Sequence, residues 1–155
     1  AGDAKRIQHF LKVYEFASLI GQLEKLPAAQ QQVLELAAIV HDIGIHAAEQ
    51  KYASTAGTYQ EREGQPLAEE MLRAAGCGEA VVQRVGFLVG HHHTYDAVDG
   101  PDYQILLEAD FLVNAYEDQL SPQAIHAVRD KVFRTESGRN LLETIYGLSV
   151  EGEER

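Results

Sequence analysis

The segment that decides the fold of this chain is Ala37-Ala38-Ile39-Val40-His41-Asp42-Ile43-Gly44. An apolar helical run here delivers a histidine and an aspartate, side by side, to the point where a glycine ends the helix. The apolar side chains are expected in the core, but burial of a carboxylate without a partner costs several kcal/mol. Adjacent residues on a helix point about 100° apart, so both side chains can border one cavity. This geometry suits two ligands of one metal ion, although His41-Asp42 alone does not decide the matter, because the dipeptide is common.

The composition limits the class of protein and the kind of partner. A chain of 155 residues, 45% apolar and 24% charged, suffices for one globular domain with a sizeable core. The net charge of −11 argues against a nucleic-acid or anionic-membrane partner, because both need a basic face. The single cysteine, Cys77, excludes an internal disulfide, and neither a signal peptide nor a membrane-spanning run is apparent. We therefore expect a cytoplasmic protein.

Apolar residues at helical spacing predict an all-α bundle of six or seven helices without a strand. Helices are expected to begin near residues 3, 27, 66, 79, 103, 122 and 137. Periodicity fades between Ile45 and Gln65, where glycine, serine and threonine predict a long loop of the kind that is usually functional or disordered. A single domain over residues 1–155 is expected, with an ordered core at about 3–148 and a solvated tail at 149–155.

Residues that bind metals accompany the apolar helices. They are His9, the pair His41-Asp42, the run His91-His92-His93, and Asp110, which lies in a helix that is apolar almost all round. Convergence of such residues from several helices is how helical bundles build metal sites. Imidazole and carboxylate suit a divalent transition metal such as iron, manganese, cobalt, nickel or zinc, as one ion or two. The alternative is that His9 lies on a polar flank and the three histidines at a solvated helix end.

The order of these residues resembles the HD-domain superfamily of metal-dependent phosphohydrolases. The matching stretches are Arg6-Ile7-Gln8-His9, His41-Asp42-Ile43-Gly44, Gly90-His91-His92-His93 and Glu108-Ala109-Asp110. The resemblance implies an all-helical core and a metal ion held by His9, His41, Asp42 and Asp110. It also implies that in a dinuclear member Asp42 bridges to a second ion, which histidines of the later helices bind.

The second ion site departs from the family pattern. Dinuclear relatives place a histidine just before the third core helix, where this chain has Glu63 in Glu63-Gly64-Gln65-Pro66-Leu67-Ala68. A carboxylate can replace imidazole at iron or manganese, so two ions remain possible; the alternative is a surface charge at a helix start. Related phosphodiesterases use a histidine pair followed by a residue that is not a ligand. That pattern implies His91 and His92 as ligands, with His93 behind them, and a shift of one residue exchanges these roles.

The resemblance implies hydrolysis of a nucleotide or another small phosphoester through a metal-activated water. Asp42 is then a catalytic residue, and a small phosphorylated molecule is the expected partner. We predict that Lys51 and Arg6 help to hold the phosphate, because they are cations near the motif in an otherwise acidic chain. The alternative is that both are solvated surface residues.

Two other functions share the same ligands. Some HD-domain proteins with a mixed-valent di-iron pair are oxygenases that cleave C–C or C–P bonds. A metal-stabilised regulatory module without turnover is a further alternative. The sequence does not separate these possibilities, and it identifies neither the substrate nor the oligomeric state.

Overall fold

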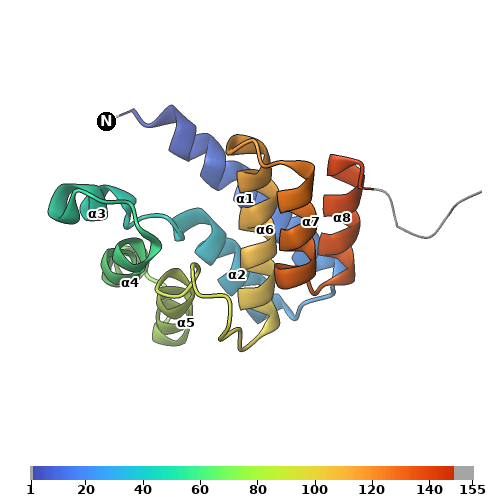
Figure 1. Ribbon diagram of the computed structural model, residues 1–155. Coiled ribbons are helices and arrows are strands. Elements are labelled where there is room, and N and C mark those ends of the chain that lie inside the picture. The colour runs from blue at the N-terminus through green and yellow to red at the C-terminus, as the bar shows by residue number, and fades with distance from the viewer. Residues whose placement is uncertain (1, 149–155) are drawn as a thin grey trace, which may run out of the picture.

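The computed structural model describes residues 2–148, and these residues form eight α-helices without a strand (Figure 1). The helices are α1 (Ala4–Leu23), α2 (Ala28–Val40), α3 (Ile45–Tyr52), α4 (Gly57–Ala74), α5 (Glu79–Val89), α6 (Pro101–Glu117), α7 (Pro122–Val132) and α8 (Glu136–Tyr146). The predicted all-α class is confirmed, whereas the predicted number of six or seven helices is wrong. The predicted tail at 149–155 lies outside the described residues.

Helix α6 is the central helix of the bundle. Eleven of its 17 residues are buried, as its apolar residues on nearly every side predict. It packs against α1 and α2 and also against α7 and α8 (Figure 1). Glu108, one of its buried residues, accepts hydrogen bonds from the backbone N–H groups of Arg134 and Thr135, which fixes the connection between α7 and α8.

Helices α3, α4 and α5 form a second group beside α2 (Figure 1). Helix α4 packs against both α3 and α5, and α5 packs in turn against α2. Helix α2 therefore contacts the α6 bundle and the second group together. Its C-terminal end, with His41 and Asp42, lies where side chains from both groups can meet. Among the helices of residues 2–148, none combines the length and the apolar character that crossing a membrane requires.

The predicted loop between residues 45 and 65 is wrong, because α3 and the first half of α4 fill it. Helix α4 runs through Pro66 instead of beginning there, although an internal proline removes a backbone hydrogen bond. The packing of α4 against the rest of the protein therefore outweighs the low intrinsic helix preference of Pro66. The backbone of α4 lies against Gly44 so closely that a Cβ at Gly44 would stand 2.3 Å from the carbonyl oxygen of Gln60. This contact sets α4 against the segment that carries His41 and Asp42.

Candidate metal centre

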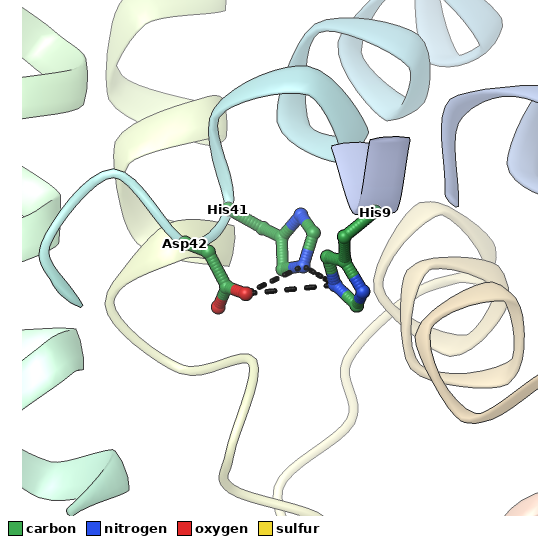
Figure 2. Close-up of side chains that lie close together, drawn as sticks. All are labelled: His9, His41 and Asp42. Atoms are coloured by element: carbon green, nitrogen blue, oxygen red, sulfur yellow. Dashed lines mark hydrogen bonds and ion pairs between the residues drawn. The ribbon is translucent and has the colours of Figure 1, made fainter. Parts of the chain in front are cut away.

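His41 and Asp42 lie in the turn that follows α2. His41 is fully buried, and its Nδ1 donates a hydrogen bond to the carbonyl oxygen of Ala38, 2.8 Å away. Because a carbonyl oxygen only accepts, Nδ1 carries a proton, and Nε2 of the neutral ring keeps its lone pair. Nε2 lies 3.5 Å from Oδ2 of Asp42, in the interior of the site (Figure 2).

Helices α1 and α6 add His9 and Asp110 to this pair. Nε2 of His9 lies 3.2 Å from Nε2 of His41 and 3.5 Å from Oδ2 of Asp42. The same nitrogen lies 3.2 Å from Oδ1 of Asp110. Figure 2 shows His9, His41 and Asp42 turned toward one another, and their ligand atoms lie within 4.8 Å of each other. The structure thus brings together the four residues that the resemblance assigns to the first ion. Their role as ligands stays a prediction.

A second group contains Asp42, His92 and His93, whose ligand atoms also lie within 4.8 Å of one another. His92 follows α5, and its Nδ1 donates to the carbonyl oxygen of Val89 at 2.8 Å. Its Nε2 lies 3.2 Å from Oδ1 of Asp42. Asp42 therefore presents Oδ2 to the first group and Oδ1 to the second. This is the arrangement that a bridging carboxylate requires.

Two residues predicted as ligands of a second ion lie elsewhere. The ring of His91 stacks on Phe87, and its Nδ1 donates to the Phe87 carbonyl oxygen at 2.7 Å, so His91 belongs to neither group. The carboxylate of Glu63 accepts hydrogen bonds from Lys51 Nζ at 2.9 Å and from the Tyr52 hydroxyl at 2.8 Å. The structure brings His92 and His93 to Asp42, whereas the sequence predicts His91 and His92 as the ligand pair, and which of the three coordinate stays a prediction.

Gln60 lies at the site in place of Glu63. Its Oε1 is 3.0 Å from Nε2 of His93, and its Nε2 donates to the carbonyl oxygen of Thr55. The reason is that α4 continues beyond Pro66 toward the N-terminus, so the residue facing the site lies a helical turn before Glu63. The signal was present in the sequence as a stripe at four-residue spacing, which the structure buries: Gln60, Gly64, Ala68 and Leu72.

A cavity of about 260 Å³ opens beside both groups. Its wall includes Asp42, Asp110, Gln60, His93, Ile45 and Arg6. The guanidinium of Arg6 is already paired with Asp3 at 3.1 Å and with Glu49 at 3.4 Å. Lys51, the other predicted phosphate ligand, is paired with Glu63 and is absent from the cavity wall. The structure therefore places Arg6 at the site but not Lys51.

The residues of the first group fit a divalent cation. Nδ1 of His9 donates to the carboxylate of Glu117 at 3.0 Å, and Nδ1 of His41 donates to a carbonyl oxygen. Both Nε2 atoms therefore carry lone pairs when the rings are neutral, yet they lie only 3.2 Å apart. Only a proton on one of them or a cation between them makes this approach favourable. Two imidazole nitrogens and two carboxylates form a suitable set for the transition metals named above.

The pKa values of the site residues also indicate that the site favours positive charge. Burial alone would raise the pKa of Asp42, but the charge of His41 and the hydrogen bond with His92 lower it to about 2. Burial also opposes ionisation of Asp110, whose pKa is nevertheless far below its usual range because His41 and His9 bond to it. Burial would lower the pKa of His41, but Asp42 and Asp110 raise it to about 9. Burial and the neighbouring His92 lower the pKa of His93 to about 4, which keeps it neutral.

Comparison with known proteins identifies the fold. No family model matches the sequence, and no curated protein matches it. Among solved structures, the chain is similar to a predicted HD superfamily hydrolase from an uncultured Thermotogales bacterium. The TM-score is 0.66 at 27% sequence identity, over 94% of this chain and 76% of that one. The chain therefore has the HD-domain fold, as its His-Asp pattern predicts. Its buried histidine and aspartate groups could hold metal ions within that fold.

Proposed function

We propose that this protein is a metal-dependent phosphohydrolase that acts on a nucleotide or another small phosphoester. The observation that carries the proposal is the position of Asp42, which presents one oxygen to each of two groups of possible ligands. The likeness to a predicted HD superfamily hydrolase supports it further. His9, His41, Asp42 and Asp110 would hold the first ion, and Asp42, His92 and His93 the second.

A bound divalent ion supplies a Lewis acid and lowers the pKa of a water molecule toward neutrality. The protein's own residues supply the position and the charge balance. Asp42 and Asp110 together offset only part of the charge of two divalent ions, so the loaded site is positive and attracts a phosphate. Arg6 and Lys5 are the cationic side chains that line the same cavity. The cavity volume of about 260 Å³ favours a small substrate.

The remaining parts of the proposal concern partners and location. A small phosphorylated molecule is the proposed partner, rather than nucleic acid or a membrane, because the net charge of −11 leaves no excess of basic residues for either. The cytoplasm is the proposed location, and the single cysteine agrees with it.

The test is phosphate release by protein that has been stripped of metal and reloaded. A chelator should abolish hydrolysis of p-nitrophenyl phosphate or of a member of a nucleotide panel, and manganese, iron, cobalt, nickel or zinc should restore it. Asp42→Asn should be inactive, because it removes the charge that both ions would share. Asp96→Asn is the matched control, since Asp96 is exposed and outside both groups. Failure to hydrolyse any phosphoester with any of these metals would contradict the proposal.

The same preparation separates the two alternative functions. An iron-loaded protein that consumes oxygen and releases no phosphate would favour the di-iron oxygenase, which needs the same shared carboxylate. Tight metal binding without either activity would favour a regulatory module. Elemental analysis of the purified protein gives the identity and the number of the ions directly.

A further inference from the structure

Glu117, the last residue of α6, contacts one of the candidate ligands from behind. Its side chain is only 13% exposed, and its Oε2 accepts a hydrogen bond from Nδ1 of His9 at 3.0 Å. Its Oε1 lies 2.6 Å from Nζ of Lys12. Both oxygens are therefore directed to specific partners on α1.

We propose that Glu117 is the positioning residue for His9 as a metal ligand. An ionised carboxylate only accepts hydrogen bonds, so Nδ1 of His9 must carry the proton. Nε2 then keeps its lone pair and faces Asp42, His41 and Asp110. A carboxylate behind a ligating histidine fixes its tautomer and ring orientation and makes it a stronger base.

The location of His9 explains why this support comes from another helix. His41 and His92 each follow the end of a helix, and each bonds to the carbonyl oxygen three residues earlier. His9 instead lies inside α1, where the backbone carbonyls are engaged in the helical hydrogen bonds. Its ring therefore needs an acceptor from outside α1, and Glu117 of α6 provides it.

One face of α6 supports the first group at two points. Asp110, Asn114 and Glu117 have the spacing i, i+4, i+7, which places them on the same side of a helix. Asn114 donates from Nδ2 to Oδ1 of Asp110 at 2.9 Å, while Glu117 holds His9. Lys12 lies one turn after His9 on α1 and balances the charge of Glu117. Because α6 is the central helix, these supports are fixed relative to the core.

The experiment measures metal affinity, so it rests on the metal-binding part of the proposed function and not on the substrate. Metal-free wild type, Glu117→Ala and Glu117→Gln are titrated with Mn²⁺ by calorimetry, and with Co²⁺ by visible absorption. Glu117→Ala should bind about 10- to 100-fold more weakly. Glu117→Gln keeps an acceptor oxygen and the side-chain volume, so its loss should be smaller. The matched control is Glu15→Gln, since Glu15 is an exposed glutamate of α1. It should bind as the wild type does.

Melting temperatures of the metal-free proteins separate positioning from folding. A positioning role predicts a change in the metal dissociation constant with little change in the metal-free melting temperature. If Glu117→Ala does not fold, the comparison of Glu117→Gln with Glu15→Gln decides. Equal affinity in the wild type and the Glu117 variants overturns this inference alone, as does equal weakening by Glu15→Gln. A wild type that binds none of the ions overturns both the inference and the proposed function.

Discussion

Asp42 joins two candidate ion sites that differ in charge. The first group contains two carboxylates, Asp42 and Asp110. The second group contains one carboxylate, Asp42, which it shares with the first group. The second group adds neutral His93 and, beside it, the neutral amide of Gln60. Because anionic ligands attract a divalent ion more strongly than neutral ones, we expect the first ion to bind more tightly than the second.

This difference predicts the effect of a charge at position 60. Oε1 of Gln60 lies 3.0 Å from Nε2 of His93, so Gln60→Glu places a carboxylate beside this histidine. The dissociation constant of the second ion should fall about 10-fold or more. Calorimetric titration with Mn²⁺ measures both dissociation constants. Gln83→Glu, an exposed change of the same kind on α5, should leave both constants unaltered. A wild type with two equal sites would contradict the argument.

Site residues could be predicted where a helix boundary was predicted correctly. The sequence could predict four of these residues, because its apolar pattern shows where α2 ends and that α6 is buried. They are His9, His41, Asp42 and Asp110. Gln60 was not predicted, and the sequence left the roles of His91 and His93 exchangeable, because side-chain direction depends on how the chain enters or leaves a helix. After α5 the chain turns, so His91 bonds back to Phe87. Glu117 was detectable in principle, since it shares the helical face of Asp110.

At the scale of elements, α3 and the beginning of α4 were the part of the fold that the sequence did not predict. Gly57, Gly64 and Pro66 all disfavour a helix by their intrinsic preference. What opposes that preference is a contact between segments distant in the chain, the approach of α4 to Gly44. Local periodicity contains no information about such a contact. The seven predicted helices, by contrast, follow apolar stripes within single segments.

The contact at Gly44 predicts a large effect of one methyl group. The backbone of Gly44 has ordinary helical angles, φ −77° and ψ −11°, so alanine is not strained there by itself. A Cβ would however stand 2.3 Å from Gln60 O and 2.5 Å from Gly64 N, which are backbone atoms. Gly44→Ala should lower the free energy of unfolding by about 1–3 kcal/mol, measured by urea denaturation. Gly78→Ala, with no atom within 4 Å of the added Cβ, is the control; it changes only the N-cap of α5 and should cost less than Gly44→Ala.

The connection from α5 to α6, which carries His92 and His93, is fastened by Arg84. Its guanidinium bonds to Asp99 at 2.7 Å and to Asp102 at 2.7 Å. Hydrogen bonds from Arg84 hold the pKa of Asp99 below its ordinary value. A carboxylate with a lowered folded pKa contributes stability above its unfolded pKa of about 3.9, and this contribution is lost as the pH falls through the folded value.

Arg84→Ala should therefore destabilise the protein in a pH-dependent way. At pH 7 the free energy of unfolding should fall by about 2 kcal/mol, because charged hydrogen bonds to the buried Asp102 are removed. The difference between wild type and variant should shrink below about pH 4, as Asp99 becomes protonated. Urea denaturation of both proteins at a series of pH values measures this difference in the free energy of unfolding. A difference that grows at low pH would show that the ion pairs are not its source.

At the scale of the whole molecule, the proposed function requires bound cations to make the site of this acidic chain positive. The net charge is −11, yet the proposed phosphorylated substrate would approach Asp42 and Asp110 closely. Arg6 is largely neutralised by Asp3 and Glu49. Without bound cations the cavity therefore repels an anion, and with them it attracts one. Substrate affinity and metal occupancy should rise and fall together.

The candidate ligands come from four places in the chain, so bound ions should also stabilise the fold as a whole. The first group takes ligands from α1, from the turn after α2 and from α6, and the second from the segment after α5. An ion that binds the native state at 100 times its dissociation constant stabilises it by about 2.7 kcal/mol. For a chain of this size that is an increase of about 5–10 °C in the melting temperature.

Scanning calorimetry with chelator and then with manganese measures the shift. Asp42→Asn should lose the shift and Asp96→Asn should keep it, because Asp42 alone belongs to both groups. An equal shift in all three proteins would mean that the ions bind elsewhere on the acidic surface.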